Sequence, residues 1–227
     1  MVKPFLVFDM DGVLVDVTDS YRETIVQTVR FFTGHEPSRT RIQEYKNAGG
    51  WNDDWELSQQ LCADFGVTLD LKIVAERFTR FFLGEGGTPG LIGHERWIAK
   101  EGLLERLSLT FRLAIFTGRH DFEVAPTLFR FCPTPLFDPI ITVDRVSEPK
   151  PSPEGLYKIA ALEPESKIWY VGDTVDDARS SQAAGVRFIG IAEAGKPRYE
   201  ETRAVLMEHG AVAVLDDINE LERVLMA

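Results

Sequence analysis

Short apolar runs rich in branched residues alternate with segments of helical periodicity over the second half of the chain. The runs predict strands over residues 110–118, 137–143, 167–173, 186–192 and 211–217, and the segments that follow them predict helices over 122–131, 153–162, 175–184, 198–209 and 219–226. Strands separated by helices form a parallel sheet. The apolar run at residues 5–9 predicts a further strand of the same sheet. The sequence therefore predicts an α/β fold.

Residues 17–94 interrupt this alternation. Apolar periodicity predicts helices over 19–32, 38–47, 53–65 and 71–83, each followed by a glycine that can end a helix, and no strand is expected among them. The glycine-rich stretch at residues 84–90 is expected to be a flexible joint where this insertion rejoins the rest of the chain. We therefore expect two domains: a parallel-sheet core from residues 1–16 and 95–227, and an all-helical domain from residues 17–94.

The charge of the chain argues against two classes of partner. Its 36 acidic residues exceed its 25 Lys and Arg, which gives a formal net charge of −11, and it has no basic tract. Such a chain is a poor ligand for nucleic acid and for anionic membranes. The longest apolar runs are too short to cross a bilayer and the N-terminus lacks the regions of a signal peptide, so we expect a soluble, cytoplasmic protein. The sequence leaves the oligomeric state open.

Polar side chains follow several of the predicted strands at their carboxyl ends. In an open parallel sheet, ligands bind beyond these ends, on loops that the sheet holds in place. We therefore expect the following residues to line one site: Asp9 and Asp11 after the first strand, Thr117 after the next core strand, Lys150 in a later turn, and Asp173, Asp176 and Asp177 after the strand over 167–173.

These residue types suit the transfer of a phosphoryl group. Carboxylates that converge on one cleft repel each other unless a cation lies among them, and Mg²⁺ is suited because it binds oxygen ligands together with water and phosphate. Thr117 can donate hydrogen bonds to phosphate oxygens, and Lys150 can offset the charge of the phosphate and of an attacking carboxylate. An Asp can act as the nucleophile that forms an aspartyl-phosphate, while a second Asp gives and takes the proton.

Four motifs carry a resemblance to a known family. The segments DMDGVLVD (9–16), FTGR (116–119), EPKPSPEGLY (148–157) and YVGDTVDD (170–177) resemble, in this order, the motifs of the haloacid dehalogenase superfamily. The resemblance implies a Rossmann-like core with a helical cap inserted after the first motif. It also implies a Mg²⁺-dependent phosphomonoester hydrolase that acts on a small phosphorylated metabolite.

The resemblance assigns roles to individual residues. Asp9 would be the nucleophile and Asp11 the acid and base, while Thr117 and Lys150 would bind the phosphate. Mg²⁺ would be held by Asp9, the backbone carbonyl of Asp11 and Asp173, with Asp177 as a direct or supporting group; whether Asp176 or Asp177 takes this part stays open. Val13 stands where the common form of the first motif has Thr.

Two segments are candidates for contacts with the substrate. Gly118 and Arg119 belong to the second motif, and Arg119 could clamp a substrate anion or be a solvated or helix-pairing residue. In the helical insertion, Gly50, Trp51 and Asn52 resemble the loop that reaches over the active site in this family. Alternatively, this loop only ends one helix and starts the next, with its tryptophans packed inside the cap. The same stretch also resembles a branch sometimes fused to histidine-biosynthesis enzymes, for which histidinol phosphate would be a candidate substrate.

Several other functions are compatible with the same residues. A phosphomutase of the same superfamily would use the same residues. Phosphonate hydrolases of the superfamily form an imine with a cap lysine, for which Lys46 is the candidate, but they lack an Asp at the position of Asp11. Outside the enzymes, a receiver-like phospho-acceptor module also combines acids, a Thr and a Lys on a parallel sheet. A binding protein that kept the fold without activity is a further alternative.

Overall fold

The computed structural model of the chain describes residues 3–225. It divides into two compact units, of which the first consists of Met1–Val15 and Trp97–Ala227 and the second of Asp16–Arg96. The expected outer ends of the sheet domain, at residues 1–2 and 226–227, and the last residue of the helix expected over 219–226 lie outside the described residues.

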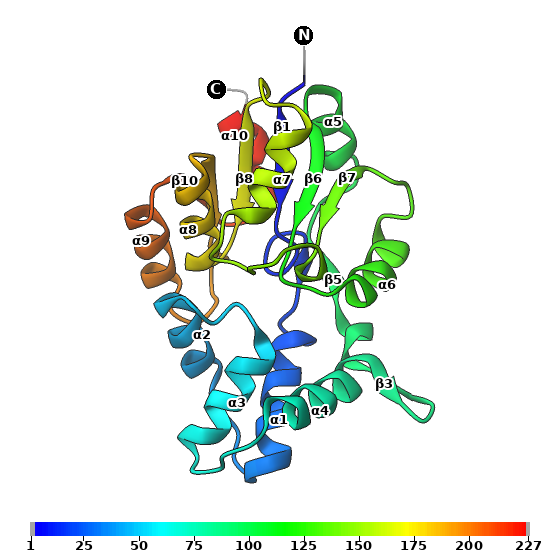
Figure 1. Ribbon diagram of the computed structural model, residues 1–227, viewed down its shortest axis with the longest axis vertical. Helices are drawn as coiled ribbons and strands as arrows, with labels where there is room; N and C mark the ends of the chain where they lie inside the picture. Colours follow the sequence, from blue (N-terminus) through cyan, green and yellow to red (C-terminus); the bar gives the residue numbers. More distant parts are fainter. Residues whose placement is uncertain (1–2, 226–227) are drawn as a thin grey trace. The chain divides into compact units, whose positions relative to one another are not determined.

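The first unit is built on a parallel sheet. Within the described part of the chain, six strands lie side by side in the order β10-β9-β8-β1-β6-β7, and each neighbouring pair is parallel (Figure 1). This arrangement confirms the α/β fold and the predicted strands. The strands are β1 (Phe5–Phe8), β6 (Arg112–Phe116), β7 (Phe137–Ile141), β8 (Ile168–Gly172), β9 (Arg187–Ile191) and β10 (Ala211–Leu215).

Helices connect these strands, as the alternation predicts. The predicted helices are found within a few residues of their expected bounds, except that the segment from residue 219 begins as a 3₁₀ turn. A helix before β6 was not predicted, because its eight residues merge with the apolar run of that strand. The helices are α5 (Leu103–Thr110), α6 (Asp121–Phe131), α7 (Glu154–Leu162), α8 (Val175–Ala184), α9 (Tyr199–Glu208) and α10 (Leu221–Leu225), with 3₁₀ turns η2 (Val143–Arg145) and η3 (Ile218–Glu220).

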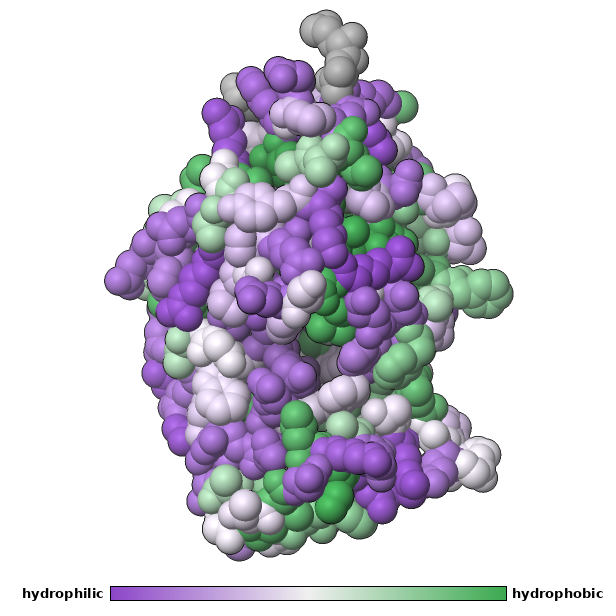
Figure 2. Space-filling model, viewed as in Figure 1, coloured by the Kyte–Doolittle hydropathy of each residue, from purple (hydrophilic) through white to green (hydrophobic). Residues whose placement is uncertain are grey.

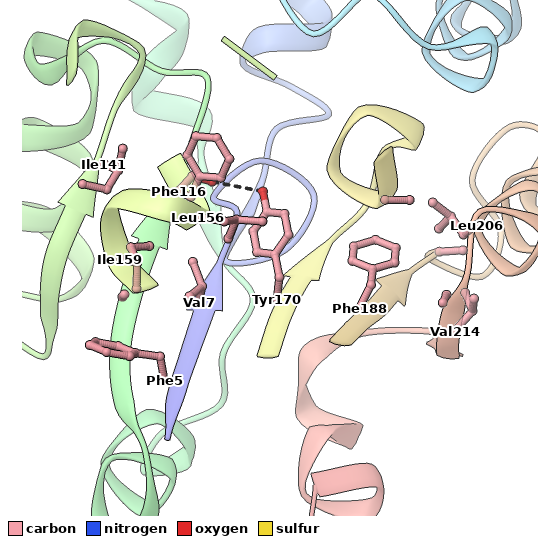
Figure 3. Packing of buried hydrophobic residues seen from close by; sticks show 14 residues of the cluster. Phe5, Val7, Phe116, Ile141, Leu156, Ile159, Tyr170, Phe188, Leu206 and Val214 are labelled. Atoms are coloured by element: carbon pink, nitrogen blue, oxygen red, sulfur yellow. Dashed lines mark hydrogen bonds between the residues drawn. The ribbon is translucent and has the colours of Figure 1, made fainter. Parts of the chain in front are cut away.

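The core of this unit lies on the central strands (Figure 3). All four residues of β1 are fully buried, as expected for a parallel strand that is covered on both faces. Tyr170 on β8 packs between Phe116 and Phe188, and its hydroxyl donates to the carbonyl of Phe116 (3.2 Å). Helix α7 approaches β6 closely at Gly155, where a Cβ would lie 2.3 Å from the Phe116 ring. This packing holds the carboxyl ends of β1, β6 and β8 in fixed positions.

The second unit is a helical domain with a small hairpin. Its helices are confirmed close to their predicted bounds, and Ser38, Asp53 and Asp70 cap three of them with their side chains. The stretch at 84–90, expected to be a flexible joint, forms a hairpin instead because Gly86 and Gly87 adopt the positive φ angles of a tight turn. The elements are α1 (Tyr21–Thr33), α2 (Arg39–Ala48), α3 (Asp54–Asp64), α4 (Leu71–Leu83), β3 (Gly84–Glu85), β4 (Thr88–Pro89) and η1 (Leu91–His94).

Two further strands are too short to be recognised from a pattern. β2 (Val15–Asp16) pairs with β5 (Arg96–Trp97) in a two-stranded sheet. The Arg96 guanidinium donates to the Asp16 carboxylate with Nη2 (2.8 Å) and Nε (3.2 Å). Asp16 thus has a structural role beside Arg96.

The face in Figure 2 is largely hydrophilic, and hydrophobic residues appear on it as separate patches. This agrees with the high content of charged residues in the chain. In the part of the chain that the structure describes, no helix combines the length and the apolar character needed to cross a bilayer.

Candidate active site

The loop after β1 brings the first and last motifs together. Asp9 follows the strand directly, and its backbone N–H donates to the carbonyl of Val171 on β8 (2.8 Å). The chain then turns through Gly12, which has a φ angle of 71° that side chains disfavour. A Cβ at Gly12 would lie 2.1 Å from Oδ2 of Asp173. Glycine is therefore needed here for two reasons, its backbone angle and the close approach of the Asp173 carboxylate.

Lys150 lies between two buried carboxylates. Its Nζ is 2.9 Å from Oδ1 of Asp9 and 2.7 Å from Oδ1 of Asp177. The ammonium also faces the aromatic rings of Phe116 and Tyr170, with its nitrogen 5.0 Å and 5.5 Å from their centroids. Lys150 and Asp9, which are expected to line one site, are therefore in direct contact.

Asp177 is fixed by hydrogen bonds to both of its oxygens. Besides Lys150, the Tyr170 hydroxyl donates to Oδ1 (2.6 Å). Thr174 donates to Oδ2 with its backbone N–H (3.0 Å) and its hydroxyl (2.7 Å), and the Asp177 N–H donates back to the Thr174 hydroxyl. This reciprocal pair caps α8. Since its oxygens already accept four hydrogen bonds, Asp177 is well placed to hold Lys150.

Tyr170 is a site residue that the sequence reasoning missed. The sequence pattern predicts only a strand residue at this position, but the buried Tyr170 hydroxyl lies among the charged groups. The available signal was the strand alternation, which places Tyr170 on the same face as Gly172, beside the acids of the last motif. A tyrosine within an apolar strand needs a partner for its hydroxyl.

Burial and charge act on the site in opposite directions. Burial raises the pKa of Asp9 to about 7, because the neighbouring Lys150 ammonium offsets only part of the lost hydration and the Asp177 and Asp11 carboxylates add repulsion. Burial alone would lower the pKa of Lys150, but the Asp177 and Asp9 carboxylates raise it above its ordinary value. Burial also disfavours the charged form of Asp177, yet the Lys150 ammonium keeps the pKa of Asp177 below its usual value. The site is thus built to carry negative charge next to a fixed cation.

Three carboxylates could hold a metal ion. Among the described residues, Asp9, Asp173 and Asp177 each offer an oxygen, and these atoms lie within 4.8 Å of one another. Carboxylate oxygens are the ligands that Mg²⁺ takes in phosphoryl-transfer sites. The donor set fits the predicted ion, and the excess of carboxylates over the Lys150 ammonium would favour a further cation. Asp176, the alternative to Asp177, is buried on α8 with Oδ1 3.9 Å from the Arg179 guanidinium.

The second motif places Thr117, Gly118 and Arg119 after β6. The backbone N–H of Thr117 donates to the carbonyl of Ile141 (3.0 Å), and its hydroxyl accepts from the Arg119 N–H (3.2 Å). Thr117 is buried and Gly118 is exposed. The Arg119 guanidinium lies against Asp11, with Nε 2.8 Å from Oδ1. Asp11, the expected general acid and base, is thus in contact with Arg119, which is expected to contact the substrate.

Comparison with known proteins identifies the family. The family model of haloacid dehalogenase-like hydrolases matches residues 5–185, which contain the four motifs. The chain belongs to this family. The resemblance of the motifs is thereby confirmed, and the hydrolase is an enzyme of the class that its sequence predicts.

Two curated relatives match nearly the whole hydrolase. It is 34% identical over 225 residues to an imidazoleglycerol-phosphate dehydratase of Phytophthora nicotianae, covering 92% of this chain and 49% of that protein. It is 29% identical over 226 residues to a phosphoglycolate phosphatase of Cereibacter sphaeroides, covering 99% of this chain and 100% of that protein. The hydrolase thus spans about half the length of the Phytophthora relative. That relative carries the name of a histidine-biosynthesis enzyme, in agreement with the resemblance to a branch sometimes fused to such enzymes.

A solved structure has the same fold. It is a conserved haloacid dehalogenase-like protein of unknown function from Agrobacterium tumefaciens, with a TM-score of 0.73 and 20% sequence identity. The match covers 99% of this chain and 98% of that one. The expected fold, an α/β core with a helical insertion, is therefore shared along the whole chain.

The loop expected to contact substrate lies in the helical unit of the hydrolase. The Lys46 ammonium donates to the carbonyls of Trp51 (2.6 Å) and Asn52 (3.3 Å) and lies 2.7 Å from Oδ1 of Asp54. Asp53 caps the next helix, as the structural alternative expected, and Gly50, which has a φ angle of 81°, is exposed. The contact of Gly50, Trp51 and Asn52 with substrate stays a prediction.

Proposed function

We propose that this hydrolase is a Mg²⁺-dependent phosphatase that cleaves small phosphomonoesters through an aspartyl-phosphate on Asp9. The observation that carries the proposal is the position of the Lys150 ammonium between Asp9 and Asp177. An oxygen of Asp173 lies within 4.8 Å of oxygens of these two aspartates. A cation there offsets the repulsion between the attacking carboxylate and the phosphate dianion. The Cereibacter relative, a phosphoglycolate phosphatase, supports the same chemistry.

The reaction would proceed in two displacements. Asp9 attacks the phosphorus and forms a mixed anhydride, while the bond to the leaving oxygen breaks and Asp11 gives that oxygen a proton. Asp11, now ionised, then takes a proton from water as the water oxygen attacks the phosphorus. This second displacement releases inorganic phosphate and restores Asp9 as a carboxylate. Thr117 and Lys150 would bind the phosphate oxygens during both steps.

The metal would be held by the acids of the first and last motifs. Asp9 and Asp173, with the backbone carbonyl of Asp11, would be its ligands, and Asp177 would support it through its hold on Lys150. Bound Mg²⁺ supplies positive charge next to the phosphate. Burial raises the pKa of Asp9 and so disfavours its ionised form. The positive charge of the metal would favour this ionised form, which is the one that can attack phosphorus.

The choice of substrate class rests on the relatives. The Cereibacter relative acts on phosphoglycolate by name, and the Phytophthora relative carries the name of an enzyme of imidazole glycerol phosphate. In the insertion loop the two acids near Trp51 are already engaged, because Asp53 caps α3 and Asp54 is paired with Lys46. We therefore propose a small phosphorylated metabolite, with histidinol phosphate and phosphoglycolate as the first compounds to test.

Two residues argue against the phosphonate hydrolase alternative. An imine-forming lysine must present a neutral amine, but the Lys46 ammonium is bound to two carbonyls and an Asp carboxylate. Asp11 stands at the position where those enzymes lack an Asp. The phosphomutase alternative uses the same residues as a phosphatase, and dependence of turnover on a bisphosphate activator would distinguish it.

The test is a Mg²⁺-supported phosphate-release assay over a panel of phosphorylated metabolites. We expect release that EDTA abolishes, and loss of that release in Asp9→Asn. Asp216→Asn, which alters an aspartate paired with Tyr199 and Arg203, is the matched control and should keep its activity. Full Mg²⁺-dependent release by Asp9→Asn would overturn the mechanism, and no release over the whole panel would favour a binding protein. A phosphoenzyme that persists without turnover would favour the receiver-like module.

A further inference from the structure

The Arg119 guanidinium is buried behind the Asp11 carboxylate. The side chain of Arg119 is 1% exposed, whereas the side chain of Asp11 is 31% exposed. A ligand can therefore reach Asp11 from solvent more readily than it can reach Arg119. The contact of Arg119 with a substrate anion stays a prediction, and the burial favours a role of Arg119 behind Asp11.

Two donors of Arg119 converge on a single oxygen of Asp11. Nε lies 2.8 Å and Nη2 lies 2.5 Å from Oδ1. A side-by-side pair would instead use both carboxylate oxygens. Among the described residues, the hydrogen bonds to the Asp11 carboxylate go to Oδ1, so the geometry leaves Oδ2 for another partner.

Arg119 is itself held from several sides. Its Nη1 donates to the hydroxyl of Thr127 (2.9 Å), a buried residue on α6. Its backbone N–H donates to the Thr117 hydroxyl, and its carbonyl accepts from the Val143 N–H (3.1 Å). The contact from α6 holds the guanidinium, and the contacts from the end of β6 and the turn η2 hold the backbone of Arg119. A group fixed in this way can fix Asp11 in turn.

We infer that Arg119 is a positioning residue that holds Oδ1 of Asp11 and leaves Oδ2 to carry the proton. The inference rests on the proposed function, in which Asp11 is the acid and base. In the first displacement, the O–H bond at Oδ2 breaks as the leaving oxygen takes the proton and its bond to phosphorus breaks. In the second, Oδ2 takes a proton from the attacking water, so the proton balance is restored. Rotation of the carboxylate would misdirect both transfers.

Leaving groups of different basicity separate this role from substrate binding. An alkoxide needs a proton as it leaves, whereas 4-nitrophenolate leaves without one. The value of kcat/KM covers the steps up to the first irreversible one, here the loss of the leaving group. A defect in the positioning of Asp11 therefore lowers kcat/KM for benzyl phosphate more than for 4-nitrophenyl phosphate. The ratio of the two values does not depend on the fraction of folded enzyme.

The experiment measures that ratio in Arg119→Met and Arg119→Lys. For Arg119→Met we expect kcat/KM for benzyl phosphate to fall about 10²-fold or more, within the range of general acid catalysis, and that for 4-nitrophenyl phosphate to fall by less than about tenfold. Arg119→Lys keeps the charge without the planar fork and should lie between Arg119→Met and the unchanged enzyme. Arg106→Met, which alters an exposed arginine paired with Glu222, is the control and should leave the ratio unchanged.

A second background tests whether Arg119 acts through Asp11. In Asp11→Asn, adding Arg119→Met should cause little further loss of kcat/KM for benzyl phosphate. An equal additional loss, or a rise in KM common to both substrates without a change in the ratio, would overturn the inference and favour a direct contact with substrate. Both outcomes would leave the proposed function intact. That function is overturned instead if Asp9→Asn stays fully active.

Discussion

The Nζ atom of Lys150 lies 2.9 Å from Oδ1 of Asp9, and both side chains are buried. The lysine follows α6 and β7 in the chain, whereas the aspartate ends β1, so the contact depends on the order of the strands in the sheet. A buried carboxylate next to an ammonium can remain charged in a site where burial alone would protonate it.

Removal of the Lys150 ammonium should destabilise the core. In Lys150→Met, Asp9 and Asp177 keep their burial but lose their shared cation, and breaking a buried ion pair costs about 3–5 kcal/mol. We expect a loss of this order in the free energy of unfolding, measured with urea, together with loss of phosphatase activity. Lys158→Met, on the partly exposed surface of α7, is the matched control. Equal unfolding midpoints for the two variants would contradict the account.

The affinity for Mg²⁺ should depend on pH. Burial raises the pKa of Asp9 to about 7, and a metal ligand must be deprotonated. Below pH 7 the ion must displace a proton from Asp9, so the affinity should weaken as the pH falls and level off above it. Titration calorimetry at about pH 6 and about pH 8, in buffers of different ionisation enthalpy, measures the proton release.

The expected result is a much larger net release of protons at the lower pH than at the higher one. Asp9→Asn should remove that release, which assigns it to this carboxyl. An affinity for Mg²⁺ that is the same at both pH values would show that Asp9 is ionised throughout, contrary to this account.

The Tyr170 hydroxyl should contribute to stability by fixing Asp177. Tyr170→Phe keeps the ring in the core but removes a donor from the buried Oδ1 of Asp177. Such a loss costs about 1–3 kcal/mol, and we expect thermal unfolding to shift accordingly while activity falls less than in Lys150→Met. Tyr157→Phe removes the hydroxyl of an exposed tyrosine and should have a smaller effect. The same shift in both variants would count against a special role of Tyr170.

Gly12 should be sensitive to any added side chain. A Cβ there meets Oδ2 of Asp173, so Gly12→Ala should displace this carboxylate and weaken the binding of Mg²⁺. Gly185 has a similar φ angle, 68°, but its Cβ would meet no atom within 4 Å. Gly185→Ala therefore reports the strain of the backbone angle alone. If the two variants bind Mg²⁺ equally well, the close approach of Asp173 to Gly12 does not affect the affinity for the metal.

Much of this arrangement could be predicted from the sequence because it depends on local patterns. Strands with branched apolar residues and helices with their periodicity were found close to their expected bounds, and the sheet then brought Asp9, Lys150 and Asp173 together. The hairpin at 84–90 was not predicted, since two glycines fit a tight turn as well as a flexible joint.

Side-chain partners could not be predicted in the same way. Arg119 follows Thr117 in the sequence, which suggested a contact with substrate, but its guanidinium turns towards Asp11 because α6 supplies Thr127 on its other side. Tyr170 likewise reaches Asp177 only through the packing of β8 against α8. The contact between Arg119 and Asp11 depends on the tertiary structure alone. For Tyr170 the strand alternation indicates which face of the sheet the side chain lies on, but it does not identify the partner of the hydroxyl.

The most direct test of the central claim is to trap the phosphoenzyme. The hydrolase is mixed with Mg²⁺ and a substrate that it turns over, quenched in acid within the first turnover, and digested for mass spectrometry. We predict a phosphate on the carboxylate of Asp9 that hydroxylamine removes, formed at least as fast as steady-state turnover. Turnover without any phosphate on the peptide that contains Asp9, or a phosphate that forms more slowly than product, would contradict the account.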